Sequence, residues 1–172
     1  MVQVDLITGF LGSGKTTFLR RYVQYLVAQG HSVCILENDF GAVNVDAMLL
    51  QDLIGEHCDI ETISGGCDCD THQRRMRTKL ISMAMRGFDR VSLSRAASLT
   101  WTSSTTFCGT SRWTAGIRWA ASLPLWTPSW KTSFPPQADY LLASEAASAG
   151  LVVMSRTQLA APGEAEAVDR TT

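Results

Sequence analysis

The chain has 172 residues, of which 45% are hydrophobic and 18% charged, and its net charge is −1. This length suits one domain with its own core, and the near-neutral charge gives no indication of nucleic acid or an anionic membrane as a partner. No stretch approaches the roughly 18 consecutive apolar residues of a membrane-spanning helix. No secretory signal precedes the first glycines, so we expect a cytoplasmic protein whose five cysteines serve thiol or metal chemistry.

The first 30 residues predict a strand, a glycine-rich loop and a helix. Residues 2–8 form a short aliphatic run typical of a buried strand, and GFLGSGKTT follows at 9–17. Residues 18–29 have the apolar spacing of a helix, which Gly30 is suited to end. This order of elements is the context of a Walker A loop, which binds the phosphates of a nucleoside triphosphate.

The chemistry of such a loop depends on its backbone. Glycines allow consecutive N–H groups to point at phosphate oxygens, and the positive end of the helix dipole adds to the attraction. We expect Lys15 to contact the β- and γ-phosphates and the Thr16 hydroxyl to bind Mg²⁺, so these two are the catalytic candidates. The predicted nucleotide-binding residues of the loop are Gly9, Gly12, Ser13, Gly14, Lys15, Thr16 and Thr17.

A second predicted strand at residues 31–37 leads into a group of carboxylates. Its aliphatic content suits a parallel sheet covered on both faces. ENDFGAVNVD at 37–46 then places acidic side chains just beyond its carboxyl end, where ligands bind in such sheets. We expect Glu37 and Asp46 to approach the magnesium ion or the γ-phosphate. For Asp39, a solvated loop carboxylate is an equal alternative.

A third predicted strand, at residues 59–63, precedes a candidate metal site. Two thiolates as close as Cys67 and Cys69 can share one soft or borderline metal ion, and Asp70 or His72 can complete a tetrahedron.

Other features of this half have simpler interpretations. Cys34 lies in the middle of a predicted strand and is expected in the core. Cys58 is either a spare metal ligand or a structural residue. The helix predicted at 71–86 carries several arginines, which we interpret as a solvated face and not as a nucleic-acid site.

Three segments together resemble the CobW family of P-loop GTPases, a branch of the SIMIBI class: GFLGSGKTT at 9–17, ENDFGAVNVD at 37–46 and ISGGCDCD at 63–70. The resemblance covers residues 1–91 well and 136–160 loosely. It implies an α/β P-loop NTPase fold with a parallel sheet and helices on both faces. It also implies that GTP binding and Mg²⁺-dependent hydrolysis are coupled to delivery of a metal ion, such as zinc or cobalt, to a client protein. Asp70 stands where the family has the third cysteine of Cys-x-Cys-Cys, which favours a harder metal site or one completed from elsewhere.

The resemblance further implies a base-reading motif of the Asn-Lys-x-Asp type. GLVVMSRTQ at 150–158 is strand-like and sits where that motif is expected. In this alignment the stem of Arg156 covers the plane of the base. Gln158 offers a neutral amide where an aspartate normally accepts two guanine N–H donors. Guanine preference is inferred by resemblance and is weakened by this substitution.

Residues 92–135 differ from the rest of the chain, so we divide the domain into 1–91, 92–135 and 136–172. No Asp or Glu occurs between Arg90 and Ala138, and all five tryptophans lie there. TWTSSTTF and LPLWTPSW do not read as the apolar strands of a doubly covered sheet, so we predict weak stability and little hydrolysis. We also expect the domain to be incomplete and the C-terminal domain usual in the family to be absent.

A shifted reading frame would explain this segment. Slipping the frame back by one base, with free choice of synonymous codons, permits IEPSGIFDVDEFYD from about Ser92 and VIAVVDAKLED from Ser122. The first contains the Glu-x-x-Gly motif of the family, and the second reads as a buried strand. We hypothesise that residues 92–135 are translated out of frame, with a genuine insertion as the alternative, and the coding DNA distinguishes the two.

The predicted function is that of a GTP-binding, Mg²⁺-dependent nucleoside triphosphatase of the metal-chaperone type. The alternatives are a metal-binding module gated by nucleotide without turnover, a phosphotransferase acting on a small acceptor, and an inactive product of a damaged reading frame.

Overall fold

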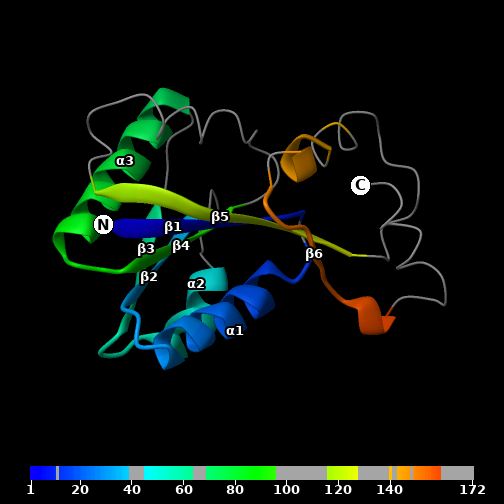
Figure 1. Cartoon of the computed structure of the whole chain (residues 1–172), viewed down its shortest axis with the longest axis horizontal. Coiled ribbons are helices and arrows are strands. Elements are labelled where there is room, and N and C mark those ends of the chain that lie inside the picture. The colour runs from blue at the N-terminus through cyan, green and yellow to red at the C-terminus, as the bar shows by residue number, and fades with distance from the viewer. Residues whose placement is uncertain are drawn as a thin grey trace.

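The computed structural model describes residues 1–10, 12–38, 45–63, 69–95, 116–127, 140, 143–147 and 149–159. These residues form an α/β architecture in which one parallel sheet lies between helices (Figure 1). The strands are β1 (Val2–Thr8), β2 (Val33–Asn38), β3 (Cys58–Ile63), β4 (Arg90–Arg95), β5 (Ile117–Trp126) and β6 (Val153–Met154).

The described sheet has the strand order β3-β2-β4-β1-β5-β6, and every pairing between neighbours is parallel. Parallel neighbours require crossover connections, and the connections here carry the helices α1 (Lys15–Ala28), α2 (Val45–Leu50) and α3 (Cys69–Met85). Figure 1 shows α1 and α2 on one face of the sheet and α3 on the other. The predicted fold class is therefore confirmed. Among the described residues, no helix is long and apolar enough to cross a bilayer.

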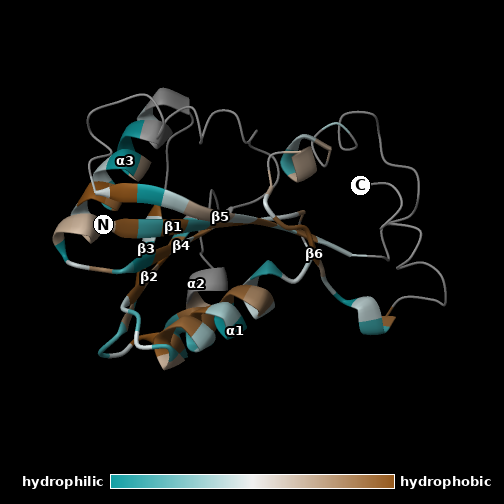
Figure 2. Ribbon diagram, viewed as in Figure 1, coloured by the Kyte–Doolittle hydropathy of each residue, from teal (hydrophilic) through white to brown (hydrophobic). Residues whose placement is uncertain are grey.

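The core lies on both faces of the sheet because successive side chains of a strand point to opposite sides. Val4 and Leu6 of β1 pack in the cluster that includes Leu80 of α3. Ile7 packs in the other cluster, with Leu19 of α1. Figure 2 shows the apolar residues running along the strands of this central layer. The near-continuous hydrophobic content of β1 and β2 thus has a direct cause in their coverage from both sides.

The end of α1 follows the sequence prediction. Gly30 has φ 86°, its N–H donates to the Val27 carbonyl at 2.9 Å, and the His31 N–H donates to the Leu26 carbonyl at 3.1 Å. This pair of bonds is a Schellman motif, in which glycine supplies the left-handed residue just past the helix.

The strand β5 corrects one expectation. LPLWTPSW was not expected to form a strand, but Leu123–Trp126 are the last four residues of β5, all buried. They continue a ladder along β1, with Ile7 opposite Leu123 and Thr8 opposite Pro124. The backbone partner offered by β1 therefore outweighs the poor strand pattern of this segment. TWTSSTTF, at residues 100–107, lies outside the described residues.

Candidate functional site

The loop between β1 and α1 has backbone angles that require glycine. The φ values are 140° at Gly9, 82° at Gly12 and 91° at Gly14. A Cβ atom at Gly9 would lie 2.7 Å from the Leu125 carbonyl oxygen of β5. The loop therefore packs directly on β5, and a larger residue at Gly9 would push it off the sheet.

The Lys15 ammonium group lies across this loop. Its Nζ donates hydrogen bonds to the carbonyl oxygens of Gly9 at 2.8 Å and Phe10 at 2.9 Å. Phosphate oxygens are stronger acceptors than carbonyl oxygens because they carry charge. The geometry thus places a cation where phosphate groups can replace two backbone acceptors.

The first turn of α1 adds an anion-binding helix terminus to the loop. Gly14 is the N-cap, no side chain caps it, and the first turn contains no acidic residue. The orphan N–H groups and the positive end of the dipole therefore have no carboxylate from their own turn. Thr16 and Thr17 belong to this first turn, and Ser13 just before it is fully buried. The predicted phosphate-binding residues are thus brought together in one loop and helix start.

The predicted carboxylates are placed less completely. Glu37 is in β2, near its carboxyl end, and its side chain is only 3% exposed. Asp46 belongs to the first turn of α2, but its side chain lies outside the described part of the structure. Asp39 also lies outside it. Of the three predicted carboxylates, Glu37 therefore has the one described side chain, and it lies two strands away from β1, in the order β2-β4-β1.

A pocket of about 380 Å³ opens beside the loop and contains the predicted base-reading residues. It is lined by Gly14, Thr17, Phe18, Arg21 and residues 153–158. After β6 the chain runs along this pocket, and the Ser155 N–H donates a 2.6 Å hydrogen bond to the Trp126 carbonyl. Arg156 then has φ 58°, a left-handed angle that is uncommon for a residue with a side chain. Arg156 and Gln158 thus share one pocket with the start of α1.

The predicted transition-metal ligands lie mainly outside the described side chains. Cys67 precedes α3, outside the described residues, whereas Cys69 and Asp70 are the first two residues of α3 with side chains that are not described. Among the described residues, no group of three metal-ligating side chains occurs.

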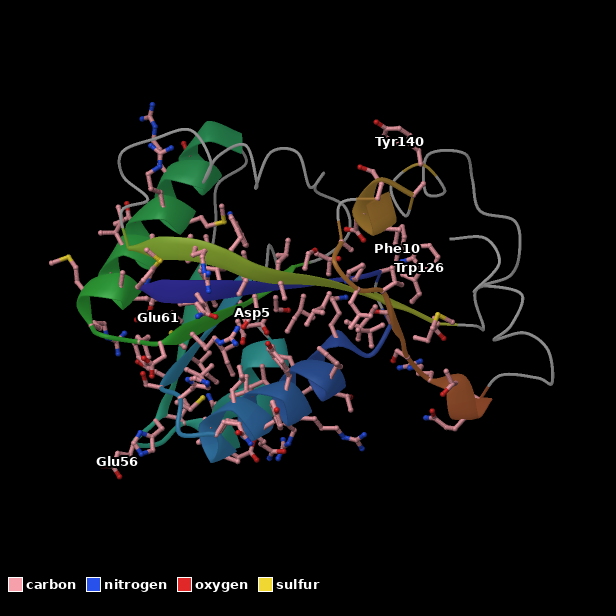
Figure 3. All side chains as sticks on the ribbon, in the orientation of Figure 1. Asp5, Phe10, Glu56, Glu61, Trp126 and Tyr140 are labelled. Carbon is pink, nitrogen blue, oxygen red and sulfur yellow. The ribbon has the colours of Figure 1, made fainter. Side chains whose placement is uncertain are left out.

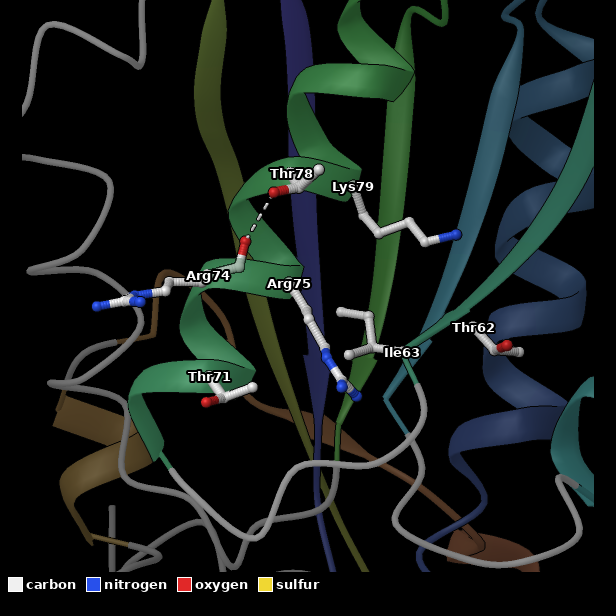
Figure 4. A pocket seen from close by; sticks show the side chains of 7 residues that line it. All are labelled: Thr62, Ile63, Thr71, Arg74, Arg75, Thr78 and Lys79. Carbon is white, nitrogen blue, oxygen red and sulfur yellow. Dashed lines mark hydrogen bonds between the residues drawn. The ribbon is translucent and has the colours of Figure 1, made fainter.

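A second pocket, of about 550 Å³, lies between the first half of α3 and the end of β3 (Figure 4). Figure 4 shows Arg75 pointing beside Ile63 towards the sheet and Arg74 pointing away from it. Lys79, which also lines the pocket, is paired with Glu61 of β3. The expectation that this basic run is solvated agrees with the exposure of Arg74 and Arg75, since both are largely exposed.

A charge pair between β1 and the start of β4 was not found from the sequence. Asp5 of β1, which is fully buried and labelled in Figure 3, accepts hydrogen bonds from Nη1 of the partly buried Arg90 at 2.9 and 3.0 Å. Burial raises the pKa of Asp5, while Arg90 and a hydrogen bond from Tyr22 of α1 act against that rise. Burial and the neighbouring Asp5 also raise the pKa of Tyr22 to about 12. The signal in the sequence was an acidic residue in the middle of VQVDLIT.

The two described free cysteines are structural. Cys34 is fully buried and Cys58 is 5% exposed. Burial raises the pKa of the Cys34 thiol to about 12 and that of Cys58 to about 11. Both thiols are therefore protonated at neutral pH, which agrees with the expectation for Cys34 and favours the structural interpretation of Cys58.

The chain is similar in sequence to known proteins. The family described as CobW/HypB/UreG, nucleotide-binding domain, matches residues 3–109. The chain is 35% identical over 82 residues to the zinc chaperone YjiA of Escherichia coli K12, a segment that is 48% of this chain and 24% of that protein. It is 38% identical over 73 residues to the zinc chaperone CobW of a Sinorhizobium species, which is 41% of this chain and 20% of that protein. The chain thus spans a minor part of the length of these relatives.

Solved structures share the fold. Zn(II)-bound YjiA GTPase from E. coli superposes with a TM-score of 0.58 at 17% identity, over 98% of this chain and 53% of that one. The hydrogenase maturation factor HypB from Archaeoglobus fulgidus also gives 0.58, at 13% identity, over 99% of this chain and 76% of that one. The family match extends over more than half of the sequence, from β1 through β4, and includes the loop that holds Lys15. The chain therefore belongs to the CobW/HypB/UreG nucleotide-binding domain family.

Proposed function

We propose that the chain binds a nucleoside triphosphate, with GTP among its ligands, and couples its nucleotide state to the delivery of a metal ion in the cytoplasm. The observation that carries the first part is the placement of the Lys15 ammonium over the loop, 2.8 and 2.9 Å from two carbonyl oxygens. Beside it, the N-terminus of α1 has neither a side-chain cap nor an acidic residue in its first turn. Both features favour a polyanion at this point.

Mg²⁺ is the proposed companion of the nucleotide. Thr16 offers a hydroxyl in the first turn of α1, and Glu37 offers a carboxylate that is 97% removed from solvent. Hard divalent cations prefer such oxygen ligands. Together with Asp46, these are the residues proposed to hold the ion, which when bound would neutralise charge on the β- and γ-phosphates.

Hydrolysis is the proposed turnover step, in which water attacks the γ-phosphate. In this step Lys15 and the backbone N–H groups of Gly12, Gly14 and the first turn stabilise the charge on the phosphate oxygens. A protein that binds nucleotide without turnover is the second candidate. It is favoured by β4, whose buried residues near the carboxyl end are Leu93 and Ser94 and include no carboxylate.

The proposed cargo is zinc or cobalt, held by Cys67, Cys69 and Asp70. Support comes from relatives: YjiA and CobW are named zinc chaperones, and HypB from Helicobacter pylori was solved in complex with nickel. Cys69 and Asp70 open α3, which packs on the same sheet as the phosphate loop. A change in the residues around 39–46 on nucleotide binding is the proposed link between the two sites, and a client protein would receive the ion.

The nucleotide proposal is tested by titrating the protein with a fluorescent GTP analogue in the presence of Mg²⁺. Lys15→Ala should lower affinity about tenfold or more, because it removes a charge-assisted contact to phosphate. Lys79→Ala is the matched control, since Lys79 is paired with Glu61 and away from the loop. Equal affinity in the wild type and Lys15→Ala would contradict the proposal.

The metal proposal is tested by competing a chromophoric zinc chelator against the protein loaded with a non-hydrolysable GTP analogue or with GDP. Zinc affinity should differ between the two nucleotide states and fall in Cys67→Ser and Cys69→Ser. Cys108→Ser, which replaces a cysteine remote in sequence from this motif, should leave affinity unchanged. Zinc affinity that is independent of nucleotide would exclude the coupling.

A further inference from the structure

The pocket beside the phosphate loop shares Gly14 and Thr17 with the loop and first turn of α1. Its volume of about 380 Å³ lies within the roughly 300–1,000 Å³ range of small-molecule pockets. This pocket is therefore the candidate site for the base of a nucleotide whose phosphates occupy the loop.

The backbone turns into the pocket at Arg156, which has a strained conformation. Arg156 has φ 58°, and the 3-10 turn Thr157–Leu159 follows it, closed by a 3.0 Å hydrogen bond from the Leu159 N–H to the Arg156 carbonyl. Left-handed backbone at a residue with a side chain costs free energy and is concentrated at ligand sites. Here it brings Thr157 and Gln158 to the lining of the pocket, where Gln158 is largely exposed.

Gln158 differs chemically from the rest of this lining. Arg21 and Arg156 can only donate hydrogen bonds, and the hydroxyls of Thr17, Ser155 and Thr157 are single groups. Gln158 alone among the described lining side chains presents a donor and an acceptor side by side in one plane. The described lining contains no carboxylate, the group that would accept hydrogen bonds from two neighbouring N–H donors at once.

The purine edges match an amide in two ways. Guanine presents the O6 acceptor next to the N1–H donor, and adenine presents the N6–H donor next to the N1 acceptor. A glutamine amide pairs with either arrangement after a half-turn about its last torsion, which is broad and roughly two-fold. Bidentate pairing of glutamine with adenine is a recurrent contact in nucleic-acid recognition. Neither arrangement uses the 2-amino group of guanine.

We propose that Gln158 reads the purine edge through its amide, so that the site binds guanine and adenine triphosphates with similar affinity. This specificity rests on the proposed nucleotide-binding function and concerns the base end of the same site. Hypoxanthine, which has the guanine O6 and N1–H but lacks the 2-amino group, is bound as well as guanine. The chain thus takes purine nucleoside triphosphates as a class.

The test is competition of a fluorescent nucleotide by GTP, ATP and inosine triphosphate, each with Mg²⁺. In the wild type the three affinities should agree within about threefold, which is less than the roughly fivefold effect of one typical net hydrogen bond. Gln158→Glu keeps the side-chain length but replaces the amide by an acceptor-only carboxylate. It should favour GTP over ATP, and GTP over inosine triphosphate, by about tenfold.

The ratio of affinities isolates base reading from added charge, because a new carboxylate repels all three triphosphates equally. Leu159→Glu places the same charge one residue beyond Gln158, at an exposed position outside the pocket lining, and should leave the ratios unchanged. A wild-type preference for GTP of tenfold or more, or unchanged ratios in Gln158→Glu, would overturn the proposal. If the wild type binds no nucleotide and Lys15→Ala behaves in the same way, the proposed function is contradicted. The proposed specificity is then contradicted as well.

Discussion

The interior strands β2 and β5 occupy comparable positions in the sheet but are built from unlike sequences. Val33, Cys34, Ile35 and Leu36 of β2 are all fully buried. The buried part of β5 is SLPLW, which includes Pro124, a residue without the N–H that a central strand normally donates. β2 fits the sheet by its own pattern, whereas β5 is placed by its ladder with β1 and by the packing of Gly9 on Leu125.

Buried polar groups of the sheet also differ in how they are satisfied. In β1, the Asp5 carboxylate has Arg90 and Tyr22 as partners. In β4 and β5, the buried Ser92 hydroxyl and Trp126 indole N–H have no hydrogen-bond partner among the described residues. A buried polar group without a partner costs free energy, so the comparison predicts where substitution lowers stability and where it raises it.

One of the largest effects is expected from Asp5→Ala. It leaves the Arg90 guanidinium beside the core without its carboxylate and should lower the free energy of unfolding by about 3 kcal/mol. Urea unfolding followed by circular dichroism measures the change. The double variant Asp5→Leu with Arg90→Met should recover much of the loss, because it removes both charges. A loss below about 1 kcal/mol for Asp5→Ala would mean that the pair is not buried as described.

Truncation of one leucine in each strand compares β5 with β2 directly. Leu125 and Leu36 are both fully buried, so Leu125→Ala and Leu36→Ala should each cost about 2–5 kcal/mol. The same unfolding measurement applies to both. A cost of this size for Leu36→Ala together with a nearly neutral Leu125→Ala would show that β5 does not belong to the packed sheet.

A smaller effect, of the opposite sign, is expected in β4. Ser92→Ala removes a buried hydroxyl without a described partner and should raise the free energy of unfolding by about 1 kcal/mol. The matched control is Ser32→Ala, which removes a hydroxyl that is hydrogen-bonded to Asp89 Oδ2 at 3.0 Å and should therefore lower stability. Destabilisation by both variants would show that Ser92 has a partner.

The smallest effect concerns pH. Hydrogen bonds from the Ser32 backbone N–H and hydroxyl lower the pKa of Asp89 below its ordinary value of 3.8. Because the folded-state pKa lies below the unfolded one, this contribution is present above about pH 3.8 and is lost as pH falls through the folded-state pKa. In Asp89→Asn, stability should fall less steeply over that acidic window. Identical slopes in unfolding curves of the variant and the wild type would contradict this assignment.

The sequence predicted the regular half of the fold and the phosphate loop because both rest on local patterns. The bounds of β1, the glycines before Lys15 and the end of α1 at Gly30 follow from periodicity and capping chemistry. The strand β5 was missed because its place depends on pairing with β1, which is 115 residues away between Val2 and Ile117. The Asp5–Arg90 pair was missed for the same reason. The placement of Gln158 in the pocket beside the loop was anticipated only from a resemblance, since no local rule places it in one pocket with Gly14.

The frame hypothesis for residues 92–135 stays a prediction, which the coding DNA tests. A strand at residues 117–126 is compatible with it, because the shifted frame from Ser122 also reads as a buried strand at this place. The structure adds that the present side chains of Leu123–Trp126 are accommodated by the sheet.

One sheet that includes β5 is expected to support the phosphate loop. Backbone hydrogen exchange tests this support most directly. Amides of β5 between Ser122 and Trp126 should be protected together with those of β1, and a GTP analogue with Mg²⁺ should further slow exchange in the loop between Gly9 and Thr17. Exchange of the β5 amides at the rate of an unfolded chain, with β1 still protected, would contradict the account.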